Sequence, residues 1–223
     1  MNHAVVLLSG GLDSTTLLHH VRQREGAGVY ALTFCYGQRH LREIAAARWQ
    51  AERAGVLEHH IADLALFPAL IPGASALTDA RLAMPALADL DSASRRQPPT
   101  YVPHRNLILL ALAAAFAEAR GVSTLYYGAQ QQDAYGYWDC TPEFQKRLNA
   151  VLALNRGTPV TVQAPFAGMR KTELVRLGLE LGVDYSHTWT CYRGAERPCG
   201  DCPACAERAT AFREAGVADP LSS

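Results

Sequence analysis

The chain lacks an excess of charge of either sign, because its 223 residues hold 21 basic and 21 acidic side chains. A general polyanion binder normally carries a basic excess, so this balance argues against nucleic acid as a partner. Long apolar runs are also lacking, since the longest, residues 107–117, is too short to cross a bilayer. The first residues show no basic stretch ahead of a long apolar segment. These absences predict a soluble, cytoplasmic protein with no membrane partner.

Cysteine is scarce, and six in a chain of this length are too few for a disulfide scaffold. Four of them lie in a C-x7-C-x2-C-x2-C pattern near the end of the chain, at Cys191, Cys199, Cys202 and Cys205. Four thiolates at this spacing suit a closed tetrahedral Zn²⁺ site. An iron–sulfur cluster is the alternative, although ferredoxin-like runs place a fourth cysteine close behind and a proline after it. The two lone cysteines are predicted to be buried and inert.

Apolar strands alternate with helical segments along most of the chain. The predicted strands are residues 4–8, 29–34, 56–61, 123–127 and 160–164. The predicted helices begin at residue 13 and cover 40–54, 106–120, 142–154 and 171–181. Continuously apolar strands between helices are typical of a parallel sheet covered on both faces. We therefore predict an α/β fold with a doubly wound parallel sheet over residues 1–186 and a small zinc-binding segment over 187–223.

Residues 63–100 interrupt this alternation, with five prolines and a polar stretch at 91–97. A long irregular connection inside a compact domain is usually a lid, a binding loop or partly disordered. We expect a mobile flap close to the active site, and a plain surface excursion is the alternative.

A glycine loop, SGGLDS at residues 9–14, follows the first predicted strand and precedes the first helix. Gly10 and Gly11 allow a sharp turn near a ligand, and free N–H groups at the helix start attract an anion. Asp13 would repel a phosphate unless Mg²⁺ bridges the two. The loop matches neither a Walker A sequence nor G-x-G-x-x-G, and a plain glycine turn with a helix cap is the alternative. Hydroxyl donors for phosphate oxygens are available from Ser9, Ser14 and Thr15.

This loop resembles the pyrophosphate loop of the ATP pyrophosphatases, which split ATP into AMP and pyrophosphate and adenylate an oxygen of their substrate. The resemblance implies that ATP with Mg²⁺ is a cosubstrate. It places ATP against Leu8, Ser9, Gly10, Gly11, Leu12, Asp13, Ser14, Thr15, Thr16, Leu17 and Leu18.

Four further strings lie where predicted strands end, which is where ligands bind in a doubly wound fold. They are FCYGQRH at 34–40, YVPHRN at 101–106, GAQQQDAYGYWDCTPEF at 128–144, and APF at 164–166 with Lys171 and Glu173 beyond it. Together with SGGLDSTT and the cysteine pattern, these strings resemble the 7-cyano-7-deazaguanine synthase family over nearly the whole chain.

That resemblance implies a Rossmann-like ATP pyrophosphatase fold, a structural zinc ion and a homodimer. The implied enzyme is a carbon–nitrogen ligase that converts 7-carboxy-7-deazaguanine and ammonia to the nitrile through an acyl-adenylate and an amide, in queuosine biosynthesis. Its expected catalytic residues are Asp13, Lys171 and Arg105. Its expected substrate-binding residues are Tyr36, Gln38, Arg105, Asn106, Asp133, Tyr137, Trp138 and Asp139.

The chain departs from the family pattern in the expected substrate region. His104 stands where the family has glycine, and residues 137–141 read YWDCT where it has YPDCR. Phe166 takes the place of a leucine. The alternatives are an enzyme that joins the same adenylated acid to another amine, a tRNA thiolase-type enzyme, and a non-catalytic zinc-stabilised nucleotide-binding protein. A thiolase would need a redox-active cysteine or a cluster, and a pure adaptor has no need of a pyrophosphate loop.

Overall fold

Five parallel strands form one sheet in the order β3-β2-β1-β4-β5. The strands of this computed structural model, which describes residues 2–39, 41–90 and 97–222, are β1 His3–Leu7, β2 Gly28–Cys35, β3 Glu58–Asp63, β4 Thr124–Tyr126 and β5 Thr161–Gln163. The order reverses between β1 and β4, which makes a topological switch point there. The predicted doubly wound sheet is confirmed.

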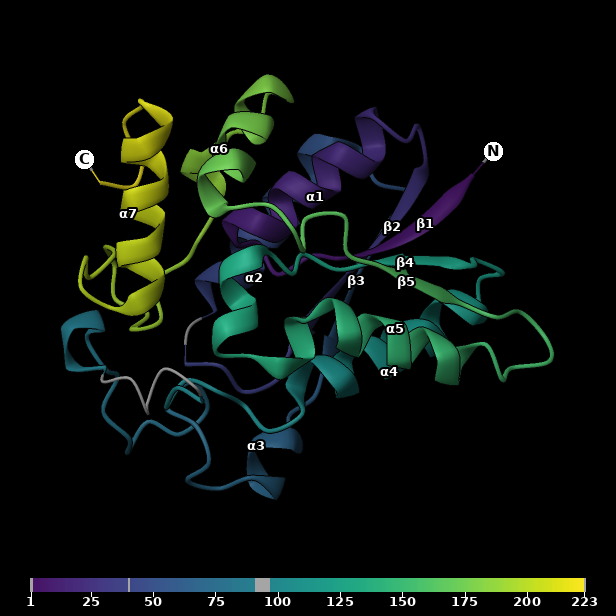
Figure 1. Ribbon diagram of the computed structural model, residues 1–223, viewed down its shortest axis with the longest axis horizontal. Helices are drawn as coiled ribbons and strands as arrows, with labels where there is room; N and C mark the ends of the chain where they lie inside the picture. Colours follow the sequence, from purple (N-terminus) through teal and green to yellow (C-terminus); the bar gives the residue numbers. More distant parts are fainter. Residues whose placement is uncertain (1, 40, 91–96, 223) are drawn as a thin grey trace.

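Helices cover both faces of the sheet (Figure 1). One apolar core joins the sheet to α1 Leu12–Gln23, α2 Arg42–Ala54, α6 Lys171–Glu180 and α7 Pro203–Ala215. A second core, on the opposite face, joins it to α4 Arg105–Glu118 and α5 Pro142–Leu152. No helix among the described residues combines the length and the apolarity needed to cross a membrane.

The third strand begins two residues later than predicted. Helix α2 ends at Gly55, which adopts a left-handed conformation with φ 62°. The Val56 amide then donates back to the Ala51 carbonyl, so Val56 still belongs to the helix end. Pairing with β2 starts only at Glu58, opposite Tyr30. The apolar pattern from residue 56 therefore marks the helix end as well as the strand.

The connection between β3 and α4 holds one short helix, α3 Phe67–Leu70, and a 3₁₀ turn at Leu87–Asp89. Further 3₁₀ turns lie at Gln131–Tyr135, Trp138–Cys140 and Tyr185–His187. The Leu87 amide donates to the Asp201 carbonyl at 2.9 Å, so the connection touches the C-terminal cysteine segment. Residues 91–96 of the expected flap, and His40 of the FCYGQRH string, lie outside the described residues. The mobility of the flap stays a prediction.

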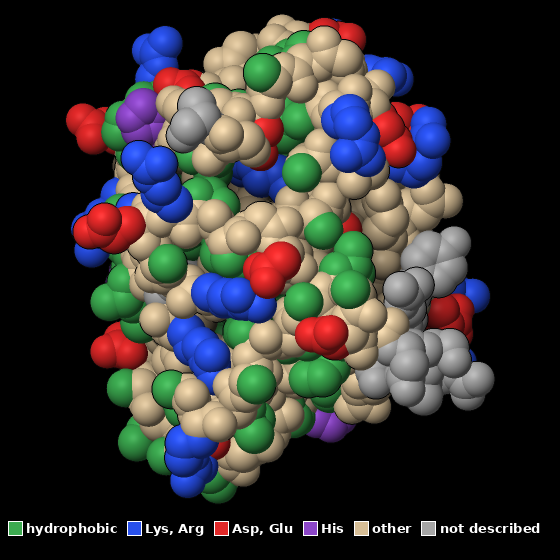
Figure 2. All heavy atoms as spheres, turned by 90° about the vertical axis from the view of Figure 1, so that its left-hand side faces the viewer, with side chains coloured by type: hydrophobic (Ala, Val, Ile, Leu, Met, Phe, Trp, Pro, Cys, Tyr) green, Lys and Arg blue, Asp and Glu red, His purple; other side chains and the backbone are tan. Residues whose placement is uncertain are grey.

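Acidic and basic side chains are interspersed on the face of the molecule that contains α7 and the β3–α4 connection (Figure 2). This mixture matches the balanced composition of the chain.

Candidate active site

A cavity of about 300 Å³ opens where β1, β2 and β4 end. Its walls come from the loop after β1, the start of α4, the turn after β4, the start of α6 and the cysteine segment. Segments far apart in the sequence therefore meet at the switch point of the sheet, which is the expected binding position in this fold. Its expected lining residues are Leu8, Ser9, Gly11, Leu12, Asp13, Ser14, Tyr36, Gln38, Arg105, Asn106, Asp133, Tyr137 and Lys171.

The glycine loop is shaped by close contact with the neighbouring helix α2. Gly10 has φ +83°, and a Cβ atom there would lie 2.1 Å from the carbonyl oxygen of Glu43. Only glycine fits this conformation and this approach. The hydroxyl of Ser14 accepts from the Ser9 amide at 3.1 Å, which folds the loop back over the start of α1. Residues 11–14 at this helix start line the cavity, which is the position that an anion site at a helix N-terminus requires.

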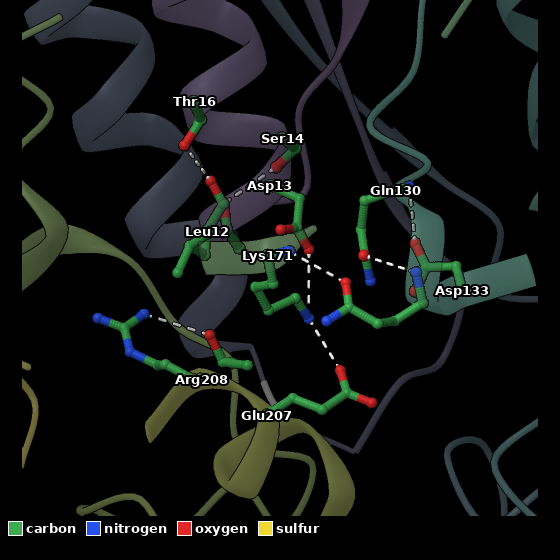
Figure 3. A network of polar contacts seen from close by, with 12 residues as sticks. Leu12, Asp13, Ser14, Thr16, Gln130, Asp133, Lys171, Glu207 and Arg208 are labelled. Carbon is green, nitrogen blue, oxygen red and sulfur yellow. Dashed lines mark hydrogen bonds and ion pairs between the residues drawn. The ribbon is translucent and has the colours of Figure 1, made fainter. Parts of the chain in front are cut away.

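Lys171 lies at the centre of a charged cluster in the cavity wall (Figure 3). Its Nζ is 3.6 Å from Oδ2 of Asp13 and 2.9 Å from Oε2 of Glu207. The Lys171 side chain is only 8% exposed. Its backbone amide donates to Oε1 of Gln132 at 3.0 Å, which fixes the start of α6 against the turn after β4.

The charged groups of this cluster shift one another's pKa values. Burial lowers the pKa of Lys171, but the carboxylates of Asp13, Glu207 and Asp133 outweigh it and hold that pKa above its ordinary value. Burial raises the pKa of Asp13, and Lys171 opposes the rise. Burial likewise raises the pKa of Asp133 to about 6. The Lys171 ammonium is therefore firmly cationic. A further positive charge in the cavity would stabilise the ionised form of the carboxyl groups beside it.

Asp13 fits a role as a cation ligand. Its Oδ1 atom is buried and has no hydrogen-bond partner among the described residues, while Oδ2 faces Lys171. An unpaired carboxylate oxygen away from water is costly unless a cation or a donor reaches it. Carboxylate oxygen is the ligand type that Mg²⁺ prefers.

The opposite wall of the cavity is aromatic and basic. The Arg105 guanidinium lies 5.7 Å from the centre of the Tyr36 ring and donates to its hydroxyl at 3.3 Å. The Tyr137 hydroxyl is 2.8 Å from the hydroxyl of Thr100. Such a wall can stack on a planar ring and attract a carboxylate.

Several expected site residues do not line the cavity. Leu17 and Leu18 belong to α1, and both are fully buried in the apolar core. Trp138 and Asp139 sit in the 3₁₀ turn that leads into α5, outside the cavity lining. The same holds for three members of the glycine loop and α1, namely Gly10, Thr15 and Thr16.

Trp138 and His104, both departures from the family pattern, contact each other. Their rings meet edge to face, with centres 5.5 Å apart. The Trp138 indole N–H donates to the hydroxyl of Tyr101 at 2.9 Å, and the same hydroxyl accepts from the His104 amide at 3.1 Å. These two residues therefore form one packing unit, and neither of them lines the cavity.

His104→Gly is expected to stabilise the protein. His104 is the one described non-glycine residue with positive φ, at 54°, and a Cβ atom disfavours that conformation by about 1 kcal/mol. The lost contact with Trp138 offsets part of the gain, so we expect a net change between about 0 and +1 kcal/mol. Urea unfolding measures it, and a clear loss of stability would show that the ring contact outweighs the backbone strain.

Asp139→Ala is expected to destabilise the fold more than it affects ATP binding. The Asp139 side chain is 2% exposed, and its Oδ2 accepts from the Asn106 amide, in the first turn of α4, at 3.1 Å. Loss of this partner leaves a partly buried helix-start amide unpaired, at a cost of about 1–3 kcal/mol. Chemical unfolding together with ATP titration tests it, and weaker ATP binding at unchanged stability would place Asp139 in the site.

The four cysteines of the C-terminal pattern converge on one point. Their sulfur atoms all lie within 4.8 Å of one another, and three of the four residues are buried. Two sulfurs accept from backbone amides, Cys191 from Cys199 and Cys199 from Cys202, each at 3.4 Å. This arrangement can hold a metal ion. The cavity wall next to it comes from the same segment, with Trp189, Thr190 and Tyr192.

Some cavity residues escaped the sequence-based prediction. Glu207 and Arg208 reach the cavity from α7, and Glu43 reaches it from α2. Burial raises the pKa of Glu43 to about 8, with Arg105 opposing the rise. No motif singles these residues out. The weak available signal is that Glu207 and Arg208 lie two and three residues after the last cysteine of the pattern.

Comparison with known proteins identifies the family. The family model described as queuosine biosynthesis protein QueC matches residues 3–216. The chain belongs to this family. Among the QueC relatives is a 7-cyano-7-deazaguanine synthase from Trichodesmium erythraeum, 44% identical over 98% of this chain and 99% of that protein. Another of the same name, from Chromohalobacter salexigens, is 47% identical over 98% of this chain and 84% of that protein. The resemblance read from the motifs is confirmed.

Solved structures with low sequence identity share the fold of this QueC family member. The U34-tRNA thiolase NcsA from Methanococcus maripaludis, with its [4Fe-4S] cluster, superposes with a TM-score of 0.51 at 15% identity. That match covers 96% of this chain and 65% of the thiolase. A predicted subunit of a tRNA methyltransferase from Methanocaldococcus jannaschii gives a TM-score of 0.50 at 16% identity, over 98% of this chain and 90% of that one.

Proposed function

We propose that the chain converts 7-carboxy-7-deazaguanine and ammonia to 7-cyano-7-deazaguanine, with ATP split to AMP and pyrophosphate, in queuosine biosynthesis. The observation that carries this proposal is the nearly full-length match to relatives of that name. The cavity supports it, because it brings a pyrophosphate-type loop and a basic, aromatic wall to one place. The alternative of a thiolase-type enzyme rests on likeness of fold alone.

The reaction needs activation because a carboxylate is a poor electrophile with a poor leaving group. Transfer of AMP to a carboxylate oxygen turns that oxygen into part of a good leaving group, and ammonia then displaces AMP to give the amide. A second transfer, to the amide oxygen, followed by loss of AMP and two protons from nitrogen, leaves the nitrile. Each oxygen of the acid therefore departs on one AMP, and one loop can serve both rounds.

Pyrophosphate leaves in each round, and the residues around the loop suit its stabilisation. Loop residues 11–14 and Lys171 line the cavity, and we propose that the loop amides and the Lys171 ammonium act as preorganised donors to the phosphates. Asp13 would hold Mg²⁺ through its unpaired oxygen, and the bound ion supplies charge neutralisation on the phosphates.

The 7-deazaguanine ring is proposed to lie against the Arg105 wall. Tyr36 and Tyr137 can stack on it, and Arg105 can orient the carboxylate before AMP transfer. Gln38, Asn106 and Asp133 complete the polar lining for its N–H and carbonyl edge. Trp138 and Asp139, which do not line the cavity, would hold the residues of this wall in place.

We further propose that the cysteine cluster holds structural zinc, that the enzyme is a homodimer and that it acts in the cytoplasm. Four thiolates in a closed set suit zinc. A colourless protein with one zinc per chain is expected, whereas visible absorption would indicate an iron–sulfur cluster. Light scattering after gel filtration gives the oligomeric state.

One incubation tests the proposed reaction. The protein is mixed with MgATP, ammonium and 7-carboxy-7-deazaguanine, and products are identified by mass while AMP is quantified. We expect the nitrile, with two AMP formed for each molecule. Accumulated amide with one AMP would indicate that the second round fails in this chain, and a conjugate with an added amine would support the alternative ligase. No AMP in the presence of the acid would refute the proposal.

A further inference from the structure

Two charged residues of the cysteine segment line the cavity, Glu207 and Arg208, and Glu207 is the one that pairs with Lys171. It lies on α7, two residues after Cys205, and its Oε2 accepts from Nζ of Lys171 at 2.9 Å (Figure 3). Asp13 stands at 3.6 Å from the same nitrogen, in ion-pair range but beyond hydrogen-bond distance. Glu207 is therefore the closer of the two carboxylates that flank the ammonium.

The position of Glu207 is set by a rigid support. The next residue, Arg208, is 3% exposed and pairs with Asp219 at 2.8 Å. Arg208 also donates to the Thr188 hydroxyl at 2.8 Å and to the Tyr185 carbonyl at 3.1 Å. These contacts tie α7 to the segment that leads into the cysteines, so the Glu207 backbone has little freedom. A lysine side chain, in contrast, is flexible and has many rotamers when nothing restrains it.

The pair is too exposed to be mainly a source of stability. The Glu207 side chain is 41% exposed, whereas that of Lys171 is 8% exposed. Half-exposed ion pairs contribute little to the free energy of folding. A fixed carboxylate can still determine where a buried ammonium points, and orientation of a charged group is worth much more in catalysis than in folding.

We propose that Glu207 is a positioning residue that holds the ammonium of Lys171 between α1 and α7, where it meets the phosphate that leaves from ATP. The presence of a departing pyrophosphate rests on the proposed function, whereas the contact between Glu207 and Lys171 does not depend on it. Glu207 thereby links the cysteine segment to the chemistry of the pyrophosphate loop. The interaction serves the transition state, because negative charge grows on the departing pyrophosphate.

The test compares Glu207→Ala with a matched control on the same helix. Glu214 accepts from the hydroxyl of Thr172, the neighbour of Lys171, at 2.7 Å. Glu214→Ala therefore removes the same charge and a similar contact between α7 and α6, but away from the cavity. For Glu207→Ala we expect kcat of acid-dependent pyrophosphate release to fall about 10- to 100-fold, with KM for ATP within about twofold. The melting temperature and metal content should match those of the control.

Glu207→Gln separates positioning from charge. Its amide oxygen can still accept from the Lys171 ammonium, but the negative charge of the acceptor is lost, so the bond is weaker than the one to a carboxylate. We expect partial rescue, with kcat lowered only about threefold. If Glu207 served folding alone, its variants would have a lower melting temperature or a lower metal content. Their kcat would then not decrease in the order parent protein, Glu207→Gln, Glu207→Ala. Equal kcat for Glu207→Ala, Glu214→Ala and the parent protein would overturn the proposal.

A second measurement needs no turnover. The chain has two lysines, Lys171 and the exposed Lys146 on α5, so trace acetylation at one fixed pH gives an internal ratio by mass spectrometry. Without the Glu207 carboxylate, Lys171 should be acetylated more readily. We expect its labelling relative to Lys146 to rise about threefold, which corresponds to the strength of an ion pair of this kind. An unchanged ratio would overturn the proposal. A changed ratio in a protein that shows no synthase activity would refute the proposed function and leave the positioning role intact.

Discussion

Asp13→Asn is expected to abolish acid-dependent AMP formation while the fold is retained. Asparagine has the shape of aspartate, and α1 is held by the core residues Leu17 and Leu18 rather than by this side chain. The amide cannot neutralise Lys171 and is a weak ligand for a hard cation. Loss of one preorganised electrostatic group costs a factor on the order of 10²–10³ in kcat.

The measurement is AMP release with and without 7-carboxy-7-deazaguanine, alongside circular dichroism and thermal melting. Ser186→Ala is a useful control, because it removes the exposed hydrogen bond from the Ser186 hydroxyl to Asp184, and Ser186 does not line the cavity. Its turnover should equal that of the parent protein. Near-normal AMP release by Asp13→Asn would show that the unpaired Oδ1 atom has no part in handling the phosphates.

The features that sequence could predict are those fixed by local pattern. Continuously apolar strands such as β1 identify a covered parallel sheet, because Val5 and Val6 point to opposite faces and both are fully buried. The glycine loop was also readable, since its sharp turn and its place between strand and helix are both encoded within a few residues.

The charged residues that pair with one another in the cavity could not be predicted from local sequence patterns. Glu207 lies 36 residues from Lys171 in the chain, and a glutamate on a helix is most often a solvated surface residue. Only the packing of α7 against α6 brings the pair together. The turn after Tyr137 shows the same limit, because the direction of its side chains depends on a 3₁₀ turn. That turn aims Asp139 at the start of α4 instead of into the cavity.

The cysteine cluster is different again, because its spacing predicts the ligands but not their effect on the site. Trp189, Thr190 and Tyr192 line the cavity, and the remaining three cysteines follow them in the sequence. The Trp189 amide donates to the Gly10 carbonyl at 2.9 Å, which connects the cluster to the glycine loop. A metal ion in the cluster would therefore help to hold the loop in shape as well as the C-terminal helix.

Cys202→Ser should cause loss of the metal ion and a large drop in thermal stability. Cys202 is fully buried, and its sulfur is one of the four that converge. It is also the N-cap residue of α7, where its side chain makes no capping hydrogen bond. Serine is a favoured N-cap residue, so the helix itself should not suffer from the change. Any loss of stability then reports on the metal site.

Metal binding in a closed thiolate site is part of the folding free energy, with apparent values of about 10–16 kcal/mol for zinc. If opening the site removes about 3 kcal/mol of this, the melting temperature falls by roughly 6–12 °C in a domain of this size. Cys35→Ser is the matched control, because Cys35 lies outside the cluster, at the end of β2. Elemental analysis and calorimetry on both variants make the comparison. A Cys202→Ser protein that loses its metal and its activity but melts at the parent temperature would contradict a structural role and assign the metal to catalysis.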